Sequence, residues 1–385
     1  MMFINDLNEM VGIWLTALSL LTLLSCTVSS RVEPVQPKEP PPPLTEPAHH
    51  CAPEQFKYGQ WIRGISACGL SAQYDFGLVE SIMVHPPPEH QTFNHFADWC
   101  WQPHNCKVRP FSVDEFCHRL AGRRMLVVGD STQHEFYVGI HMQLHVPYQP
   151  PTQWVVDDLI NDNSRLGKIC DGKGGGRLEY IRNDQISMSD VVPWNLPAFF
   201  NGVRVISRDW KVVAPHFDIL VLNKGTHYLP DGVSKAQTRE TAAFLRQFLA
   251  EDPKRHVFFR TTPPGHPHCS NLSRANETLL LSEPTWMPPL TEAEHKLFVD
   301  TFNYDKFPHM NEETVRILLE MLPPRQFTVL YVAEMSVLRP DGHRCFMNGQ
   351  GKEECDWIHH YMPSVVDSWV HVLFNLLPTH GPDGI

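Results

Sequence analysis

The sequence predicts an α/β protein with a three-layer α/β/α arrangement around a mainly parallel sheet, preceded by a small disulfide-rich N-terminal module. Beyond about residue 110, short apolar runs alternate with amphipathic segments of helix length. This alternation is typical of a parallel sheet covered by helices on both faces. Before that point the chain is rich in cysteine and tryptophan and shows little periodicity, as in "FADWCWQPHNC".

The elements expected after residue 110 follow one another in a regular order. Strands are expected at residues 123–129, 217–223, 255–261 and 327–335, and helices at residues 113–122, 132–145, 235–251, 310–323 and 365–377. The strands end in polar residues, in "VVGDS", "VLNKGTHY", "FFRTTPPGH" and "AEMSVLRPDGH". Because parallel sheets carry their chemistry at the carboxyl ends of the strands, these four ends are where a site is expected.

The N-terminal residues predict a membrane segment and a spacer. Residues 11–28 are eighteen residues without a charge, a length at the lower edge of a membrane span. We therefore interpret residues 1–30 as an uncleaved signal anchor or a cleaved signal peptide. Residues 31–50 form a proline-rich stem, because "PVQPKEPPPPLTEP" favours an extended polyproline conformation. The module then occupies residues 51–110 and the large domain residues 111–385.

The location of the large domain is open on charge alone, because the acidic residues before the span and Arg31 after it favour a cytosolic body. Glycosylation triplets at Asn271 and Asn276 favour a lumenal or secreted one. Ten cysteines without a Cys-x-x-Cys pair also favour secretory disulfides over a metal site. Nine of the ten lie outside the span, and Cys117, in a helical pattern, is our prediction for the free thiol.

Composition excludes several classes of function. A net charge of −11 without clustered lysine and arginine argues against a nucleic-acid partner. The glycine run at residues 174–176 lacks the following Lys-Ser or Lys-Thr of a phosphate-binding loop, so no nucleotide cofactor is expected. The adjacent His359 and His360 have no further ligands at zinc spacing, and we predict no metal.

Ser131 is the candidate nucleophile, since it follows a strand and Gly-Asp at the start of a helix. The alternative is that Ser131 or Asp130 only caps this helix. A serine hydroxyl needs a base, and Asp356 and His359 are three residues apart, so that on a helical turn or in a tight loop the carboxylate can orient the imidazole. The alternative for this pair is a solvated surface turn.

Donors for an oxyanion are expected from the Ser131 backbone amide, the side chain of Asn223 and an amide of the glycine-rich loop, taken as Gly175. Three further polar residues at strand ends are either groove residues that bind the acceptor or ordinary surface residues. These are Arg260, His227 and Arg339.

These motifs resemble, in order, the trichome-birefringence-like proteins of the PC-esterase branch of the SGNH (GDSL-like) hydrolase superfamily. "CAPEQFKYGQWI" and "WCWQPHNC" resemble the family's N-terminal module, and "RRMLVVGDS", "VLNKGTHY" and "VFFRTTPPGH" its later blocks. "DWIHHYMPSVVDSW" is similar to the ending Asp-x-x-His-Trp-Cys-Leu-Pro-Gly-x-x-Asp-x-Trp. The chain departs from the plant pattern at His134 and Glu135, where an Arg-Asn pair is usual, and at His360 and Tyr361, which replace Trp-Cys, so that Cys355 is expected to take over that disulfide.

The resemblance implies an SGNH-like fold and an O-acyltransferase or acylesterase that acts on polysaccharide hydroxyls. It implies Ser131 as nucleophile, His359 as base and Asp356 as its orienting partner, with an acyl donor such as acetyl-CoA or another acetyl carrier. It further implies a single-pass type II protein of the Golgi membrane with a lumenal catalytic domain, with secretion as the alternative. The expected function is glycan O-acetyl transfer through an acyl-serine.

Two alternatives stay open from the sequence. One is a carbohydrate acetylesterase, because nothing in the triad chooses between water and a sugar as acceptor. The other is a catalytically silent glycan-binding protein of the same fold. Trp61, Trp99 and Trp101 favour the second if they are exposed to stack on sugars, although packing of a small disulfide module is the more ordinary role of such residues.

Overall fold

The computed structural model describes residues 49–71, 98–146, 167–187, 198–200, 203–205, 209–267, 291–347 and 353–379. Glu46–Ile385 form one compact unit, so the predicted module and the predicted large domain belong to the same unit. Met1–Thr45 form the other unit, and the predicted membrane segment within it lies outside the described residues. Asn271 and Asn276 also lie outside them. In the part of the chain that is described, no helix is long and apolar enough to cross a membrane.

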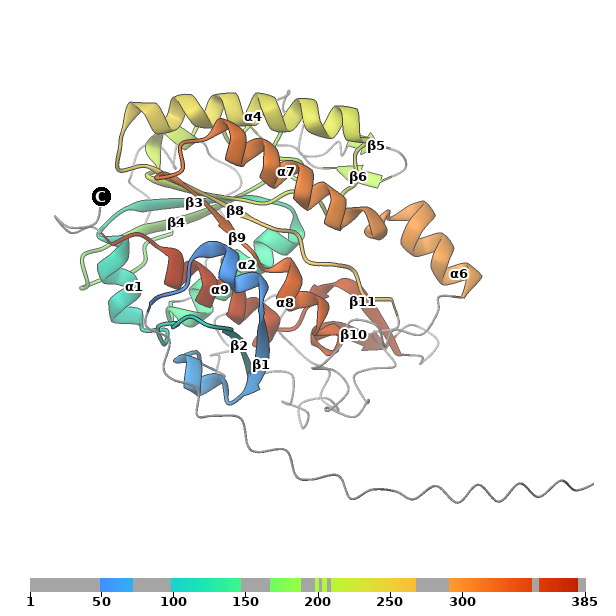
Figure 1. The fold of residues 1–385 in the computed structure, drawn as a ribbon, viewed down its shortest axis with the longest axis horizontal. Helices are drawn as coiled ribbons and strands as arrows, with labels where there is room; N and C mark the ends of the chain where they lie inside the picture. Colours follow the sequence, from blue (N-terminus) through green and yellow to red (C-terminus); the bar gives the residue numbers. More distant parts are fainter. Residues whose placement is uncertain are drawn as a thin grey trace, which may run out of the picture. The chain divides into compact units, whose positions relative to one another are not determined.

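A five-stranded parallel sheet forms the centre of the unit (Figure 1). Its order is β4-β3-β7-β8-β9, and each neighbouring pair is parallel. The strands are β3 (Arg124–Gly129), β4 (Arg177–Arg182), β7 (Ile219–Leu222), β8 (His256–Arg260) and β9 (Phe327–Leu330). The predicted mainly parallel sheet is confirmed.

Helices cover both faces of this sheet (Figure 1). On one face lie α4 (Asp231–Glu251) and α7 (Phe307–Met321), and on the other α1 (Val113–Leu120), α2 (Ser131–Gln143) and α9 (Val365–Leu376). Along β3, Met125 and Val127 pack in the cluster with α2 and α9, whereas Leu126 and Val128 pack in the cluster with α4 and α7. The alternation of a strand's side chains thus buries both faces of the sheet.

Three two-stranded antiparallel pairs complete the strands in the part of the chain that the structure describes. They are β1 (Gly59–Arg63) with β2 (Trp99–Pro103), β5 (Ala198–Phe200) with β6 (Val203–Val205), and β10 (His343–Met347) with β11 (Glu353–His360). In the described ranges, the remaining α-helices are α6 (Glu292–His295) and α8 (Ala333–Val337). Short 3₁₀ helices span Pro53–Lys57, Ile65–Cys68, Ala214–His216, Tyr304–Lys306 and Pro340–Gly342, and a π-helical turn spans Lys296–Thr301.

The tryptophans of the N-terminal module pack inward. Trp61 and Trp101 are buried, and their indole N–H groups donate to the carbonyls of Met335 (3.0 Å) and Phe56 (2.9 Å). The ring of Trp99 is partly buried against the same core. Of the two roles left open for Trp61 and Trp101, packing is confirmed: Trp61 bonds to Met335 of the large domain, and Trp101 bonds to Phe56 within the module.

The prediction of Cys117 as the free thiol is wrong. Cys117 on α1 is bonded to Cys170, 53 residues further along the chain, in the loop before β4. The helical pattern around Cys117 carries no information about a cysteine in a distant loop. Whether Cys117 is free or disulfide-bonded depends on that distant cysteine. Cys51–Cys106 and Cys68–Cys100 staple the module, and Cys355 is also disulfide-bonded, as expected.

Two strand predictions need correction. Strand β4 is absent from the predicted strands, and two of its alternating positions hold the charged residues Arg177 and Glu179. Both are buried and neutralise each other at 2.8 Å, so the strand packs despite its charges. The strand expected at 327–335 ends at Leu330, and its last residues belong to α8.

Candidate active site

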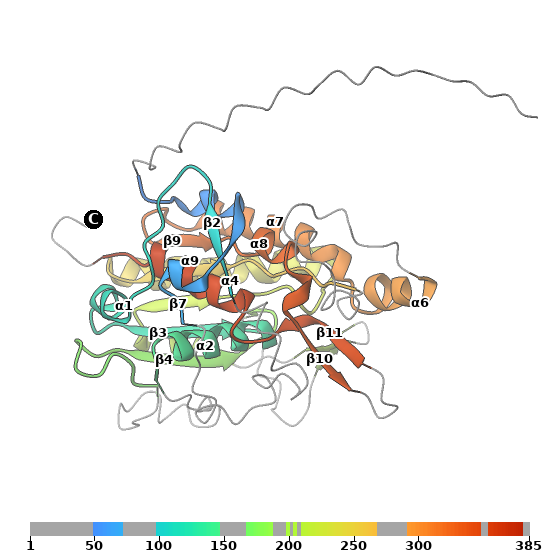
Figure 2. The same cartoon turned by 90° about the horizontal axis from the view of Figure 1, so that it is seen from below.

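Helix α2 follows β3 at the carboxyl edge of the sheet (Figure 2), and Ser131 is its first residue. Asp130, and not Ser131, caps the helix: its Oδ1 accepts from the backbone N–H groups of Thr132 at 2.9 Å and Gln133 at 3.2 Å. The cap satisfies N–H groups that have no acceptor within the helix. The Ser131 hydroxyl is consequently left for another partner.

Asp130 is fully buried and stays ionised. Burial alone would raise its pKa, but the charge of Arg260 and hydrogen bonds from the hydroxyls of Thr226 and Thr132 hold the pKa below its usual value. Glycine is required at position 129, because a Cβ there would lie 2.7 Å from the Cβ of Gln133. The conformation of the strand-to-helix turn is therefore constrained before Asp130 by close packing at Gly129, and after it by the bonds to the N–H groups of Thr132 and Gln133.

Asp356 and His359 lie in a bulge of β11. In the hairpin, Cys345 pairs with Cys355 and His343 with His360, so residues 356–359 oppose the single Arg344. Within the bulge the Asp356 Oδ1 accepts from the backbone N–H groups of Ile358 (3.0 Å) and His359 (3.1 Å). In a regular strand, side chains three apart face opposite ways. The bulge is the tight loop that lets this pair meet.

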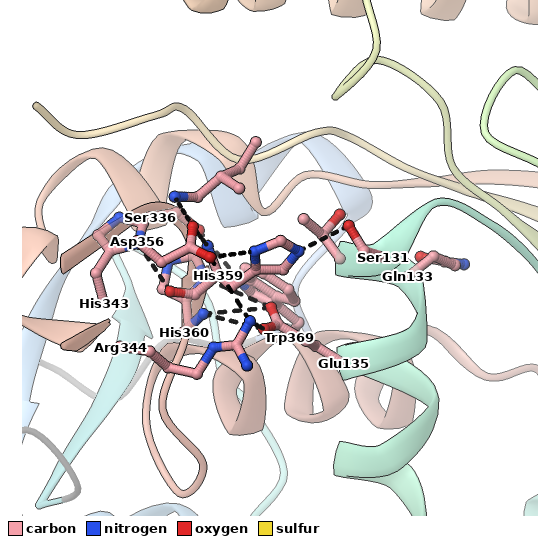
Figure 3. A network of polar contacts seen from close by, with 12 residues as sticks. Ser131, Gln133, Glu135, Ser336, His343, Arg344, Asp356, His359, His360 and Trp369 are labelled. Carbon is pink, nitrogen blue, oxygen red and sulfur yellow. Dashed lines mark hydrogen bonds and ion pairs between the residues drawn. The ribbon is translucent and has the colours of Figure 1, made fainter. Parts of the chain in front are cut away.

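The structure brings Ser131, His359 and Asp356 together in one chain of hydrogen bonds (Figure 3). His359 Nδ1 donates to Asp356 Oδ2 at 2.7 Å, which leaves Nε2 to accept from the Ser131 hydroxyl, also at 2.7 Å. The side chains of His359 and Asp356 keep 19% and 31% of their exposure. The chain of hydrogen bonds is thus partly exposed to solvent.

Electrostatics hold Asp356 charged and make His359 a stronger base. Burial would raise the pKa of Asp356, but its hydrogen bond with His359 and the bulge N–H groups keep that pKa far below the usual range. Burial would lower the pKa of His359, but the hydrogen bond to Asp356 and the charge of Glu135 outweigh it, and the pKa is raised. Asp356 therefore favours the protonated imidazole that forms when His359 takes the serine proton.

Of the predicted oxyanion donors, the Ser131 amide and Asn223 lie at the carboxyl edge of the sheet, because Ser131 begins α2 and Asn223 directly follows β7. Asn223 is fully buried, and its amide donates to the Arg260 carbonyl (3.1 Å) and the Thr262 hydroxyl (2.9 Å). The prediction for Gly175 is wrong. Gly175 precedes β4, whose first residue pairs with the first residue of β3, so it lies at the opposite edge of the sheet from Ser131.

Arg260 and Arg339 do not line a groove, which corrects their prediction as residues that bind the acceptor. Arg260 is fully buried, donates to Gln133 Oε1 (2.6 Å) and Thr132 Oγ1 (2.8 Å), and lies over the ring of Trp369. Arg339 is buried in a two-pronged pair with Asp341. Both guanidinium groups are internal supports.

His227 Nε2 lies 3.3 Å from Oδ2 of the buried Asp184, and the His227 side chain is partly exposed near Asp130. Binding of the acceptor by His227 therefore stays a prediction. Glu135 and Arg344, for which the sequence predicts no role, lie beside the bulge. The one sequence feature that could have pointed to Glu135 is that it stands, with His134, where the plant relatives usually have an Arg-Asn pair. No such feature points to Arg344, because its position opposite Asp356 depends on the bulge.

A serine hydrogen-bonded to a histidine–carboxylate pair, at the carboxyl edge of a parallel sheet, is the arrangement of a hydrolase-type enzyme that transfers acyl groups. The chain belongs to the PC-Esterase family, the GDSL/SGNH-like acyl-esterase family found in Pmr5 and Cas1p, whose model matches residues 183–376. This confirms the family expected from the motifs.

Its relatives include two proteins of Arabidopsis thaliana. Trichome birefringence-like 42 is 21% identical over 307 residues, which cover 74% of this chain and 79% of the relative. Trichome birefringence-like 13 is 21% identical over 387 residues, covering 92% and 90%. The chain is also similar to the periplasmic domain of a Salmonella ser. Paratyphi A lipopolysaccharide acetyltransferase, with 12% identity, coverage of 67% and 83%, and a TM-score of 0.33.

Proposed function

We propose that this protein is an O-acyltransferase that moves an acetyl group to a hydroxyl of a polysaccharide through an acyl-Ser131 intermediate. The observation that carries the proposal is that both ring nitrogens of His359 are engaged, one by Asp356 and one by the Ser131 hydroxyl. Membership of an acyl-esterase family supports the same chemistry. The glycan acceptor and the acetyl donor belong to the proposal.

Acylation begins when Ser131 Oγ attacks the carbonyl carbon of the donor and His359 Nε2 takes the hydroxyl proton. The negative charge that develops on the carbonyl oxygen is stabilised by the Ser131 backbone N–H. The bond to the leaving group breaks, and His359 returns its proton to that group. A sugar hydroxyl then attacks the acyl carbon while His359 accepts its proton, and the Ser131 oxygen leaves and regains a proton.

Water in place of the sugar gives the acetylesterase, and the same hydrogen bonds serve both acceptors. The acetylesterase is kept as the second candidate because the family is described as an acyl-esterase family. The two are separated by incubating the protein with an aryl acetate and an unacetylated glycan. Acetyl on the glycan supports transfer, and free acetate alone supports hydrolysis.

The test of the serine uses a fluorophosphonate, which reacts preferentially with activated serines. We expect one adduct on the wild type, none on Ser131→Ala, and an unchanged adduct on Ser66→Ala, whose serine is exposed and outside the site. Ser131→Ala should also lower turnover by about 10⁴-fold or more. Wild-type protein without an adduct would support the silent glycan-binding alternative instead.

A lumenal Golgi location, with residues 11–28 as a membrane anchor, remains part of the proposal. It is supported by the disulfides of the described residues, which form in oxidising compartments. Secretion is the alternative. A mass shift on removal of N-glycans, lost in an Asn271→Gln and Asn276→Gln double variant, tests exposure to the lumen.

A further inference from the structure

Glu135 is a fully buried carboxylate that the proposed acyl transfer does not use. It stands one turn after Ser131 on α2, so the two side chains share a face of that helix. Glu135 Oε1 accepts from the backbone N–H of His360 at 3.1 Å. Since His360 follows His359 in β11, two hydrogen bonds join the Ser131 helix to the His359 strand (Figure 3).

Arg344 lies between Glu135 and Asp356. Its Nη2 is 3.6 Å from Glu135 Oε1 and 3.8 Å from Asp356 Oδ2. One positive charge is thus shared by two carboxylates. When both carboxylates are ionised, the His359 imidazole faces a local excess of negative charge, which favours its protonated form.

We propose that Glu135 is a positioning residue that holds the His359 segment of β11 against the Ser131 helix and places a second negative charge behind the imidazole as it takes the serine proton. This inference rests on the proposed function. The main-chain bond to His360 fixes the approach of the two elements, and a misplacement of about 1 Å at such a site costs on the order of a hundredfold in rate. The charge acts only when His359 becomes positive.

The ionisation of Glu135 is set by its neighbours on four elements. Burial raises the pKa of Glu135 to about 7, while the charges of His359 and Arg344 oppose the rise. The charge of Glu135 in turn raises the pKa of His359. Among the described residues, the titratable and charged groups around Glu135 are His134 on α2, Arg260 on β8, Arg344 on β10, and Asp356, His359 and His360 on β11.

Two variants separate the two roles. Glu135→Gln keeps an oxygen that accepts from the His360 N–H but removes the charge, and Glu135→Ala removes both. With an aryl acetate as substrate, we expect Glu135→Gln to move the acid limb of the kcat/KM profile down by on the order of one pH unit. Glu135→Ala should show the same shift and a further loss of about tenfold or more at the plateau. The control Glu179→Gln removes a buried carboxylate of β4 and should leave the limb in place.

Arg344→Gln is the complementary variant, and it remains informative if a Glu135 variant does not fold, because Arg344 is partly exposed. Its charge lowers the pKa of His359, so its removal should move the same limb upward. A limb unmoved in both Glu135→Gln and Arg344→Gln overturns the charge role. Equal plateaus for Glu135→Ala and Glu135→Gln overturn the positioning role.

The failure of this inference can be told from the failure of the proposed function. The His359 imidazole is titrated by NMR in wild type and Glu135→Gln, which requires no turnover. A lower His359 pKa in the variant supports the charge role even in a protein without transferase activity, and an equal pKa overturns it. Absence of a fluorophosphonate adduct on Ser131 refutes the proposed function alone.

Discussion

Asp130 is expected to dominate the stability of the strand-to-helix turn, which makes its replacement the sharpest test of the fold around Ser131. Asp130→Ala removes the acceptor of the Thr132 and Gln133 N–H groups and of two threonine hydroxyls. Loss of an N-cap costs about 1 kcal/mol. It also removes one of the two carboxylate charges, those of Asp130 and Glu135, that stabilise the charged form of the fully buried Arg260, and the loss of a buried charge partner costs up to about 3–5 kcal/mol. Because the two terms overlap, we expect a loss of about 3–5 kcal/mol in the free energy of unfolding.

The assay is urea unfolding followed by circular dichroism, with Asp130→Asn to separate the two terms. Asparagine keeps an acceptor oxygen for the cap, so Asp130→Asn should be about 1 kcal/mol less damaging than Asp130→Ala. Asp114→Ala, an exposed acid in the first turn of α1, should cost less than about 1 kcal/mol. Since the pKa of Asp130 is depressed, its contribution is present above the unfolded pKa of about 4 and disappears as the pH falls through the folded value. A loss below about 1 kcal/mol for Asp130→Ala refutes the reasoning.

Three further predictions concern elements away from Asp130. Replacing Cys117 and Cys170 together by alanine should cost about 2–4 kcal/mol, seen as a lower urea midpoint, because a loop of 53 residues is released in the unfolded chain. Gly139→Leu should cost about 1–3 kcal/mol, since a Cβ there already lies 2.9 Å from Val366 of α9; a thermal midpoint equal to wild type argues against close packing of α2 on α9. Burial lowers the pKa of Lys224 to about 7, so wild-type stability should gain a rising component between pH 7 and 10 that Lys224→Met lacks; parallel pH curves contradict it.

The sequence could predict the Ser131, His359 and Asp356 set because each signal is local. Gly-Asp-Ser after an apolar run marks a strand-to-helix turn, and the spacing of Asp356 and His359 suits a tight loop. What it could not provide was the form of that loop. A bulge opposite Arg344 depends on the pairing of β10 with β11, which neither segment reveals alone.

The direction in which the polar side chains at the strand ends point could not be predicted from the sequence. Arg260 was placed correctly at the end of β8, and the alternation of the strand even assigns it to the face of Phe258. Its burial depends on Asp130, Gln133 and Trp369, which come from other elements. A polar side chain after a strand is available to the site only when it is not already bonded to a buried group inside the protein.

The first turn of α2 shows why capping and chemistry do not compete in this chain. The Asp130 carboxylate accepts hydrogen bonds from the N–H groups of Thr132 and Gln133, so the Ser131 hydroxyl is not needed to cap the helix. That hydroxyl instead bonds to His359. Ser131→Ala therefore leaves every bond of the cap in place. Loss of activity in that variant, without loss of stability, reports on the hydroxyl alone, whereas an effect of Asp130 on rate must first be corrected for unfolding.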